Sequence, residues 1–272
     1  MYKSIFRYLF LVFCLHGCYG SKLISSKFKP SIIKTDPFYI QTFSKINAYN
    51  HHSNEYIFYI EGDGLITRNG INPTSDPTPQ NKLVLRLVEL DNRSNIFYIA
   101  RPCQYTIGID PICNFSYWTD KRWSKEVILS LNEAINIISK GNPIHLIGFS
   151  GGGGIAVLIA AINPNIKTIT TIAGNLDIVY FNTIHQSKQS KGSLNPISFT
   201  RNLSIPQFHL VGENDKVVPY AITDRYIKAS NAKYNKKIVC NYCDHAGDEW
   251  MIFWNEFLRK QSSKDIKNKD NN

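Results

Sequence analysis

The sequence lacks any concentration of charge of one sign, although it is basic as a whole. Its 272 residues include 31 Lys and Arg but only 21 Asp and Glu, which gives a net charge of +10. The lysines are scattered, apart from a polar segment at residues 260–272. A nucleic-acid-binding surface needs its basic residues on one face or in one run. We therefore expect no nucleic-acid partner, but a solvated basic surface that can be attracted to an anionic membrane.

Two further absences argue against common cofactor sites. The glycines at residues 151–154 are followed by Ile155 and Ala156, whereas a phosphate-binding P-loop needs a Lys and then a Ser or Thr. The CxxC motif Cys240–Cys243 has no second CxxC to complete a four-cysteine zinc site. The sequence therefore predicts no metal site and no organic cofactor.

The apolar run near the N-terminus is short. Two basic residues precede residues 8–15, a run too short to span a bilayer and typical of a secretory signal peptide. Residues 15–18, Leu-His-Gly-Cys, resemble a bacterial lipobox, in which the cysteine is lipidated and becomes the mature N-terminus. We expect a signal peptide at residues 1–17 and lipidation of Cys18, with simple cleavage after Gly20 as the alternative. Either interpretation predicts an exported bacterial protein, periplasmic or at the outer membrane, and the first adds a lipid anchor.

Four cysteines remain after this segment. An even number in an exported protein indicates two disulfides, and four cysteines allow three pairings. We favour the local pairing, which joins Cys103 to Cys113 and Cys240 to Cys243. A redox or metal role for the CxxC motif is the alternative.

The sequence shows no internal repeat and no second domain. Segments rich in β-branched and aromatic residues predict strands at residues 36–46, 55–62, 95–102, 143–149, 167–174, 206–214 and 236–243. Helical spacing and helix boundaries predict helices at residues 81–92, 120–141, 153–164, 218–230 and 247–260. This alternation implies an α/β fold with a mainly parallel central sheet and helices on both faces. We expect one domain at residues 18–260 and a disordered polar tail at 261–272. The long irregular segments 65–81 and 175–203 are candidate lids or substrate loops.

Ser150 lies where a predicted strand meets a predicted helix, with glycines on both sides. Residues 148–152, Gly-Phe-Ser-Gly-Gly, match the G-x-S-x-G nucleophile elbow, in which the serine sits on a strained turn. The flanking glycines let strand and helix approach closely, and the helix N-terminus brings free N–H groups to the hydroxyl. The pattern predicts that Ser150 is a nucleophile.

With this motif in its setting, the chain resembles the α/β-hydrolase superfamily over nearly all of its mature length. That superfamily orders its triad as Ser, then Asp or Glu, then His. The resemblance implies that Asp215, in the segment HLVGENDKVVP, is the acid; Glu213 and Asp224 are its nearby rivals. It implies that His245, after the last strand, is the base, which Asp215 would orient.

Other histidines have simpler explanations. His145 and His209 fall in predicted core strands, and residues 51–52 fall in an early turn. His185, in the irregular segment, is the one serious competitor of His245 for the role of the base.

The resemblance also implies an oxyanion hole made by two backbone N–H groups. One belongs to Gly151, and the other lies in the loop after an early strand, where we expect Asp63. Many members of the superfamily have His-Gly in that loop, whereas this chain has Glu61-Gly62. Because this chain differs from the superfamily at this point, the Asp63 donor is less well defined than the Gly151 donor.

Several segments resemble recurrent blocks of an uncharacterised bacterial branch of the superfamily; they include YIEGDG, SDPTPQN, ARPCQY, YWTDKRWSKEV and AGNLD. Four aromatic residues are candidates for an apolar acyl pocket or for the core: Trp118, Trp123, Phe149 and Phe181.

We expect an exported serine hydrolase that cleaves a small-molecule ester through an acyl-enzyme. The alternatives are an amidase or peptidase of the same fold, a binding lipoprotein without catalysis, and a thioredoxin-like role for the CxxC motif.

Overall fold

The computed structural model of the chain describes residues 27–45, 53–68 and 70–269. The expected signal peptide at 1–17 and the expected lipidation site Cys18 lie outside the described residues. Among the residues that are described, no helix combines the length and the apolar character needed to cross a bilayer.

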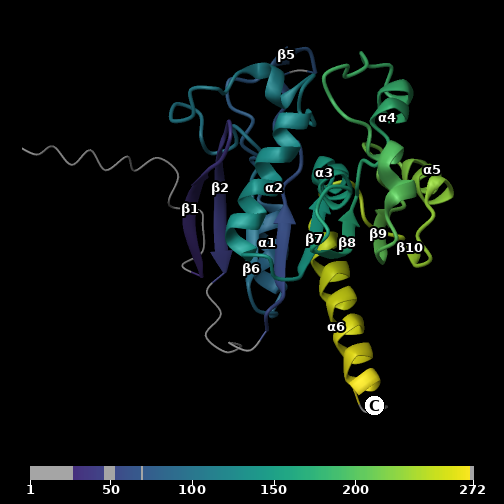
Figure 1. The fold of residues 1–272 in the computed structure, drawn as a ribbon. Helices are drawn as coiled ribbons and strands as arrows, with labels where there is room; N and C mark the ends of the chain where they lie inside the picture. Colours follow the sequence, from purple (N-terminus) through teal and green to yellow (C-terminus); the bar gives the residue numbers. More distant parts are fainter. Residues whose placement is uncertain (1–26, 46–52, 69, 270–272) are drawn as a thin grey trace, which may run out of the picture.

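An eight-stranded sheet forms the centre of the molecule (Figure 1). Its strands follow the order β1-β2-β6-β3-β7-β8-β9-β10, and β2 alone runs in the direction opposite to the other strands. The strands are β1 Phe28–Lys34, β2 Tyr39–Lys45, β3 Tyr56–Ile60, β6 Ile96–Ile99, β7 Ile144–Phe149, β8 Ile166–Ile172, β9 Gln207–Gly212 and β10 Asn235–Cys240. A short hairpin of β4 Thr67–Arg68 and β5 Asn72–Pro73 stands apart from this sheet. The predicted mainly parallel sheet is confirmed.

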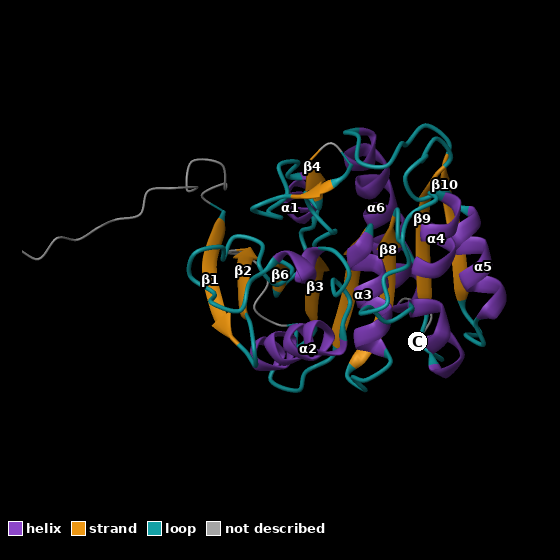
Figure 2. Cartoon of the chain, turned by 90° about the horizontal axis from the view of Figure 1, so that it is seen from above, coloured by secondary structure: helices purple, strands orange, loops and turns teal. Residues whose placement is uncertain are grey.

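Helices cover both faces of the sheet, as Figure 2 shows from above. One face carries α1 Leu83–Leu90 and α6 Glu249–Lys269, which pack against each other. The other carries α2 Lys125–Ser139, α3 Gly151–Ala160 and α5 Ala221–Ala229. The remaining helical segments are α4 Ile178–Ile184 and the 3₁₀ helices η2 Phe115–Trp118 and η3 Pro196–Asn202. The α/β-hydrolase architecture expected from the sequence is therefore present.

The core consists of two apolar layers, one on each side of the sheet. Helix α2 shows how the sequence builds one layer: Val127, Leu131 and Ile135 recur at helical spacing and are fully buried. Helix α3 is buried all round, with every residue from 151 to 159 inside the protein. Because α3 starts directly after Ser150, this packing fixes the position of the serine.

Three segments differ from the sequence prediction. Helix α6 continues to Lys269, whereas the sequence predicts a disordered tail from residue 261. The helix extends because adding a residue to an existing helix costs far less free energy than nucleating a new one, and because Lys and Gln are good helix formers. Strand β1 was not predicted, because it is an edge strand with a mostly exposed pattern and a proline. Helix α2 begins at Lys125 rather than near 120, because residues 120–123 form turns.

Both candidate lid segments contain structure of their own. Residues 65–81 include the β4–β5 hairpin, and residues 175–203 include α4 and η3. Both lie at the carboxyl ends of the parallel strands, the edge of the sheet at which ligands bind in open α/β folds.

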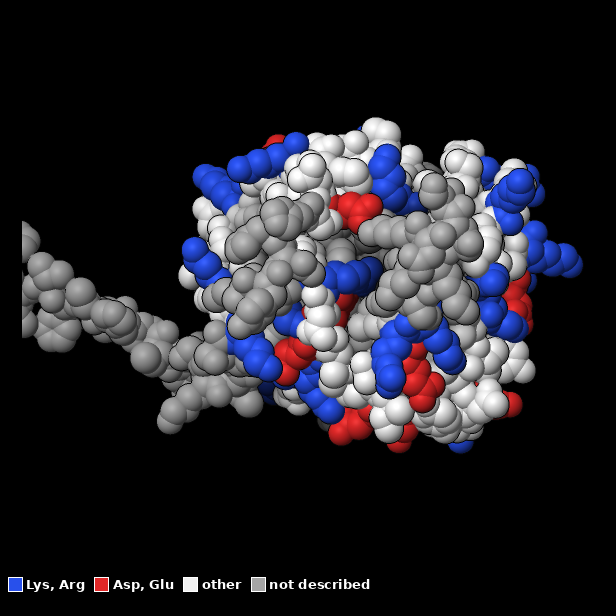
Figure 3. All heavy atoms as spheres, turned by 90° about the horizontal axis from the view of Figure 1, so that it is seen from below, with Lys and Arg blue, Asp and Glu red and all other residues white. Residues whose placement is uncertain are grey.

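Basic side chains are distributed over the surface. On the described part of the face shown in Figure 3, Lys and Arg side chains lie at the rim and also towards the centre, with Asp and Glu side chains among them. The positive net charge is therefore spread out on this face, in agreement with the scattered lysines of the sequence.

Candidate active site

Ser150 sits on a sharp turn between β7 and α3. Its backbone has φ +50° and ψ −120°, a strained conformation for a residue with a side chain. Two glycines allow the turn: a Cβ on Gly148 would lie 2.2 Å from the carbonyl oxygen of Gly152, and one on Gly152 would lie 2.3 Å from that of Ile60. The G-x-S-x-G pattern thus forms a sharp strand-to-helix elbow that presents the serine hydroxyl.

The structure brings the three residues of the predicted triad together. His245 Nε2 lies 3.0 Å from Ser150 Oγ, and His245 Nδ1 lies 2.8 Å from Asp215 Oδ2. The other oxygen of Asp215 accepts hydrogen bonds from the N–H groups of Val217 and Val218, at 2.9 and 2.7 Å. The carboxylate is fully buried, so its orientation is fixed and it can hold the imidazole in one tautomer.

The competing histidines lie elsewhere. His185 Nε2 contacts the carbonyl oxygen of Val217 at 2.8 Å, and its ring packs on Phe181. His209 is fully buried beside Thr171, and burial lowers its pKa to about 3. Of these histidines, His245 is therefore the one placed to take a proton from Ser150.

Two backbone N–H groups lie beside the serine. Gly151 is the first residue of α3, so its N–H has no carbonyl in a preceding helical turn to donate to. The N–H of Asp63, in the loop after β3, donates to no residue within the described parts of the chain. Both Asp63 and Ser150 line the same pocket. Of the two predicted oxyanion donors, Asp63 therefore lines the pocket beside Ser150, and Gly151 follows Ser150 in the chain.

The side chain of Asp63 is held by a cluster that the sequence reasoning missed. Arg101 Nη1 lies 2.8 Å from Asp63 Oδ1, Arg122 Nε lies 3.2 Å from Oδ2, and Trp123 Nε1 donates to Oδ1 at 3.3 Å. Burial alone would raise the pKa of Asp63, but Arg122 and Arg101 outweigh it and hold that pKa below its usual value. The carboxylate also packs on Gly151, where a Cβ would lie 2.1 Å from Oδ1.

The pocket above the serine has a volume of about 370 Å³, within the range of small-molecule sites. Its apolar lining includes Leu65, Ile66, Leu83, Phe149, Phe181 and Val217. Both candidate lid segments thus contribute to the pocket. Of the four aromatic candidates, Phe149 and Phe181 line it, whereas Trp118 and Trp123 belong to the core.

The cysteines pair as predicted, Cys103 with Cys113 and Cys240 with Cys243. The second disulfide lies at the base of the loop that carries His245. The carbonyl oxygen of Cys243 accepts a hydrogen bond from Asn214 N–H at 3.1 Å, which ties this loop to the segment that carries Asp215.

Removal of the second disulfide is expected to reduce activity more than stability. A loop this short gives the disulfide only about 2 kcal/mol of stabilisation, whereas His245 is only two residues from Cys243. For Cys240→Ser/Cys243→Ser we expect at least a tenfold fall in kcat/KM and a small fall in Tm. Ester hydrolysis and thermal unfolding of the same sample measure both, and full activity in a less stable protein would contradict the expectation.

Glu61, which stands where many superfamily members have histidine, is buried at the start of the loop after β3 that carries Asp63. It accepts hydrogen bonds from Gly62 N–H at 2.8 Å and from the Tyr98 hydroxyl at 2.9 Å. Burial raises the pKa of Glu61 to about 7, and these hydrogen bonds only partly oppose the shift.

This raised pKa predicts a pH-dependent stability. Between pH 4.5 and about 7 the folded protein keeps the proton of Glu61 while the unfolded chain loses it, so the free energy of unfolding falls as pH rises. At about 1.4 kcal/mol per pKa unit the fall is about 3 kcal/mol. Glu61→Gln has no such proton, and its stability relative to wild type should rise over this range. Urea unfolding at several pH values tests this, and parallel profiles would contradict it.

Comparison with known proteins agrees with this geometry. The chain matches none of the curated proteins. Its fold is similar to that of Est1E from Butyrivibrio proteoclasticus, with a TM-score of 0.63 and 13% identity over 88% of this chain and 99% of that one. The Pyrococcus furiosus esterase Pf2001 gives a TM-score of 0.61 and 16% identity over 90% and 96% of the two chains. An alpha-beta serine hydrolase homologue from Coxiella burnetii gives 0.60 and 14% over 86% and 96%.

At these identities the solved structures show the fold alone. The family is shown by the match of the sequence to a family model. Residues 92–246, more than half of the 272-residue chain, match the model of the serine hydrolase family FSH1. The matched region includes Ser150, Asp215 and His245. This chain belongs to the serine hydrolase (FSH1) family.

Proposed function

We propose that the protein hydrolyses carboxylic esters with Ser150 as nucleophile, His245 as general base and Asp215 as the residue that orients His245. The observation that carries the proposal is the continuous hydrogen-bonded chain from Ser150 Oγ through both ring nitrogens of His245 to Asp215 Oδ2. A strained elbow residue, a base in contact with it and a buried carboxylate behind the base form the constellation that acyl transfer needs.

The reaction follows from these contacts. Ser150 Oγ attacks the ester carbonyl while His245 Nε2 takes its proton, and the carbonyl oxygen becomes an oxyanion. The N–H groups of Gly151 and Asp63 stabilise that charge. The bond to the alcohol breaks, His245 returns the proton to the alcohol, and an acyl-enzyme remains. Water, deprotonated by His245, then releases the acid and regenerates Ser150.

The pocket supports a small substrate with an apolar acyl or alcohol group. Its lining is mostly aliphatic and aromatic, and its volume of about 370 Å³ accommodates a small acyl group rather than a long polymer segment. Amides and peptides are the alternative substrates of the same residues. The esterase assignment is favoured because the solved structures of similar fold include proteins whose names call them esterases.

A panel of chromogenic esters, amides and peptides, incubated with the purified mature protein, tests the proposal. We expect cleavage of short apolar esters and covalent labelling by a fluorophosphonate. Faster cleavage of amides would change the substrate class and leave the residues in place. A protein that cleaves none of them and resists the probe would instead be a binding protein with a hydrolase fold.

We also propose that the protein is exported and attached to a bacterial membrane through lipidated Cys18. The support is the lipobox-like sequence at residues 15–18 after a short apolar run. Mass spectrometry of the N-terminal peptide of protein expressed in bacteria tests it. A lipidated Cys18 is expected, and an unmodified start at Ser21 would exclude the anchor but not export.

A further inference from the structure

We propose that Gln104 is a positioning residue for the oxyanion hole: it acts through the carbonyl group of Gly62 to aim the N–H of Asp63 at the reacting oxygen. This inference rests on the proposed ester hydrolysis. It assigns a role to the ARPCQY segment, which neither the triad nor the pocket lining uses.

The peptide bond between Gly62 and Asp63 links Gln104 to the Asp63 N–H. Gln104 Nε2 donates a hydrogen bond of 3.0 Å to the carbonyl oxygen of Gly62. That carbonyl and the N–H of Asp63 belong to the same planar trans peptide, so they point in opposite directions. The hydrogen bond that fixes the Gly62 carbonyl therefore also fixes the direction of the Asp63 N–H.

Gln104 is itself held firmly. Its side chain is 1% exposed, and its Oε1 accepts a hydrogen bond of 3.0 Å from the backbone N–H of Arg101. Its two chain neighbours, Cys103 and Tyr105, both have positive φ, +70° and +63°. Non-glycine residues rarely adopt this conformation, and two around one glutamine indicate that the surroundings impose its position.

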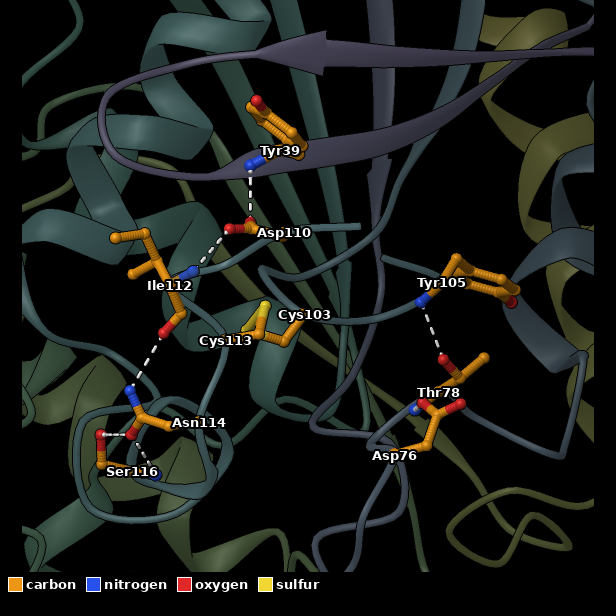
Figure 4. The surroundings of a disulfide bond; sticks show 10 residues. All are labelled: Tyr39, Asp76, Thr78, Cys103, Tyr105, Asp110, Ile112, Cys113, Asn114 and Ser116. Carbon is orange, nitrogen blue, oxygen red and sulfur yellow. Dashed lines mark hydrogen bonds between the residues drawn. A yellow bond between two sulfur atoms is a disulfide. The ribbon is translucent and has the colours of Figure 1, made fainter. Parts of the chain in front are cut away.

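Several contacts anchor the loop at residues 101–113, which carries Gln104, as Figure 4 shows. Cys103 is joined to Cys113 by a disulfide, and Tyr105 N–H donates to Thr78 Oγ1 at 2.8 Å. Asp110, further along the same loop, accepts a hydrogen bond from Tyr39 N–H at 2.8 Å. The loop is therefore fastened to β2 and to the segment before α1, which makes it a rigid support for Gln104.

The loop at residues 61–64, which carries the Asp63 N–H, is also confined by other contacts. A Cβ on Gly64 would lie 2.1 Å from the carbonyl oxygen of Pro77 and 2.7 Å from Gln104 Nε2. The carboxylate of Asp63 is bound by Arg101 and Arg122. The Gly62 carbonyl, the Asp63 side chain and Gly64 are thus held, while the Asp63 N–H donates to none of the described residues and Asp63 lines the same pocket as Ser150.

Loss of the Gln104 amide should affect the transition state more than substrate binding. The Gly62 carbonyl would be left buried without a partner, and its peptide could rotate to find one, which would turn the Asp63 N–H away. Because the negative charge on the substrate oxygen develops in the transition state, the change should appear in kcat rather than KM. Complete loss of such a donor costs about 10²–10³-fold. Misdirection of a donor that is still present should cost about 10–100-fold.

The experiment compares Gln104→Met with Gln207→Met. Gln207 is also fully buried and accepts a hydrogen bond of 2.9 Å from Tyr226, but it lies at the start of β9, away from the site. We expect Gln104→Met to lower kcat at least tenfold with KM within twofold of wild type, and to slow fluorophosphonate labelling equally while the final labelled fraction stays complete. Gln207→Met should lower Tm and leave kcat within twofold. If Gln104→Met does not fold, Gln104→Asn, which keeps the amide but is too short to reach Gly62, replaces it.

The outcomes separate this inference from the proposed function. A Gln104 variant whose kcat stays within twofold of an active wild type would overturn the positioning role alone. An equal fall in kcat in the Gln104 and Gln207 variants would also overturn it, because both would then report only lost stability. A wild type that hydrolyses no ester and resists the probe would overturn both proposals.

Discussion

Ser150→Ala is expected to abolish ester hydrolysis, with a fall in kcat of about 10⁴–10⁶-fold. The hydroxyl is the only group of the elbow that can form the acyl-enzyme, and neither His245 nor the oxyanion donors can replace it. Alanine keeps the Cβ and so keeps the packing between β7 and α3. The circular dichroism spectrum should therefore be unchanged, and Tm should rise slightly or stay constant because the strained elbow loses no packing contact.

The measurement is steady-state hydrolysis of the best ester of the panel. Residual activity above a few per cent, in a preparation free of wild type, would contradict the role of Ser150. Ser116→Ala, on η2 and outside the pocket lining, is a matched control that removes a serine hydroxyl elsewhere and should leave kcat unchanged.

His245→Ala is expected to cause nearly the same loss, and Asp215→Asn a smaller one. Asparagine keeps the size of Asp215 and can still accept from the N–H groups of Val217 and Val218, but it no longer stabilises the charged imidazole. Because the three residues act as a unit, the double variant Ser150→Ala/His245→Ala should be no slower than Ser150→Ala alone.

His185→Ala is the control for this prediction. His185 is the histidine that competes with His245 in the sequence, and it packs on Phe181 at the pocket wall. Its removal should change KM by at most a few-fold and leave kcat near wild type. A large loss of kcat in His185→Ala, with His245→Ala active, would show that the base is assigned to the wrong histidine.

The sequence was informative where a local pattern has one structural meaning. The glycines around Ser150, with a strand before and a helix after, predict an elbow, because glycine on both sides lets strand and helix approach without Cβ clashes. The positions of Asp215 and His245 were predictable only through the resemblance to the α/β-hydrolase superfamily, whose triad order this chain follows. The local pairing of the cysteines was predictable because Cys103–Cys113 and Cys240–Cys243 are close in sequence.

The sequence was uninformative where distant segments decide the outcome. Arg101 and Arg122 come together on Asp63 from segments 38 and 59 residues away, and the scattered positive charge gave no sign of this. Gln104 acts on Gly62 across 42 residues. Nothing local distinguishes these residues from surface arginines and glutamines, although the ARPCQY segment marked the region.

Mapping the fluorophosphonate adduct on the wild-type protein tests the central claim most directly. The probe forms a covalent bond with a serine only where a base activates the hydroxyl and oxyanion donors stabilise the attacked centre. Digestion and mass spectrometry should find one adduct per chain, on Ser150, and none in Ser150→Ala or His245→Ala. An adduct on a different residue, or an unlabelled protein that still hydrolyses esters, would contradict the account.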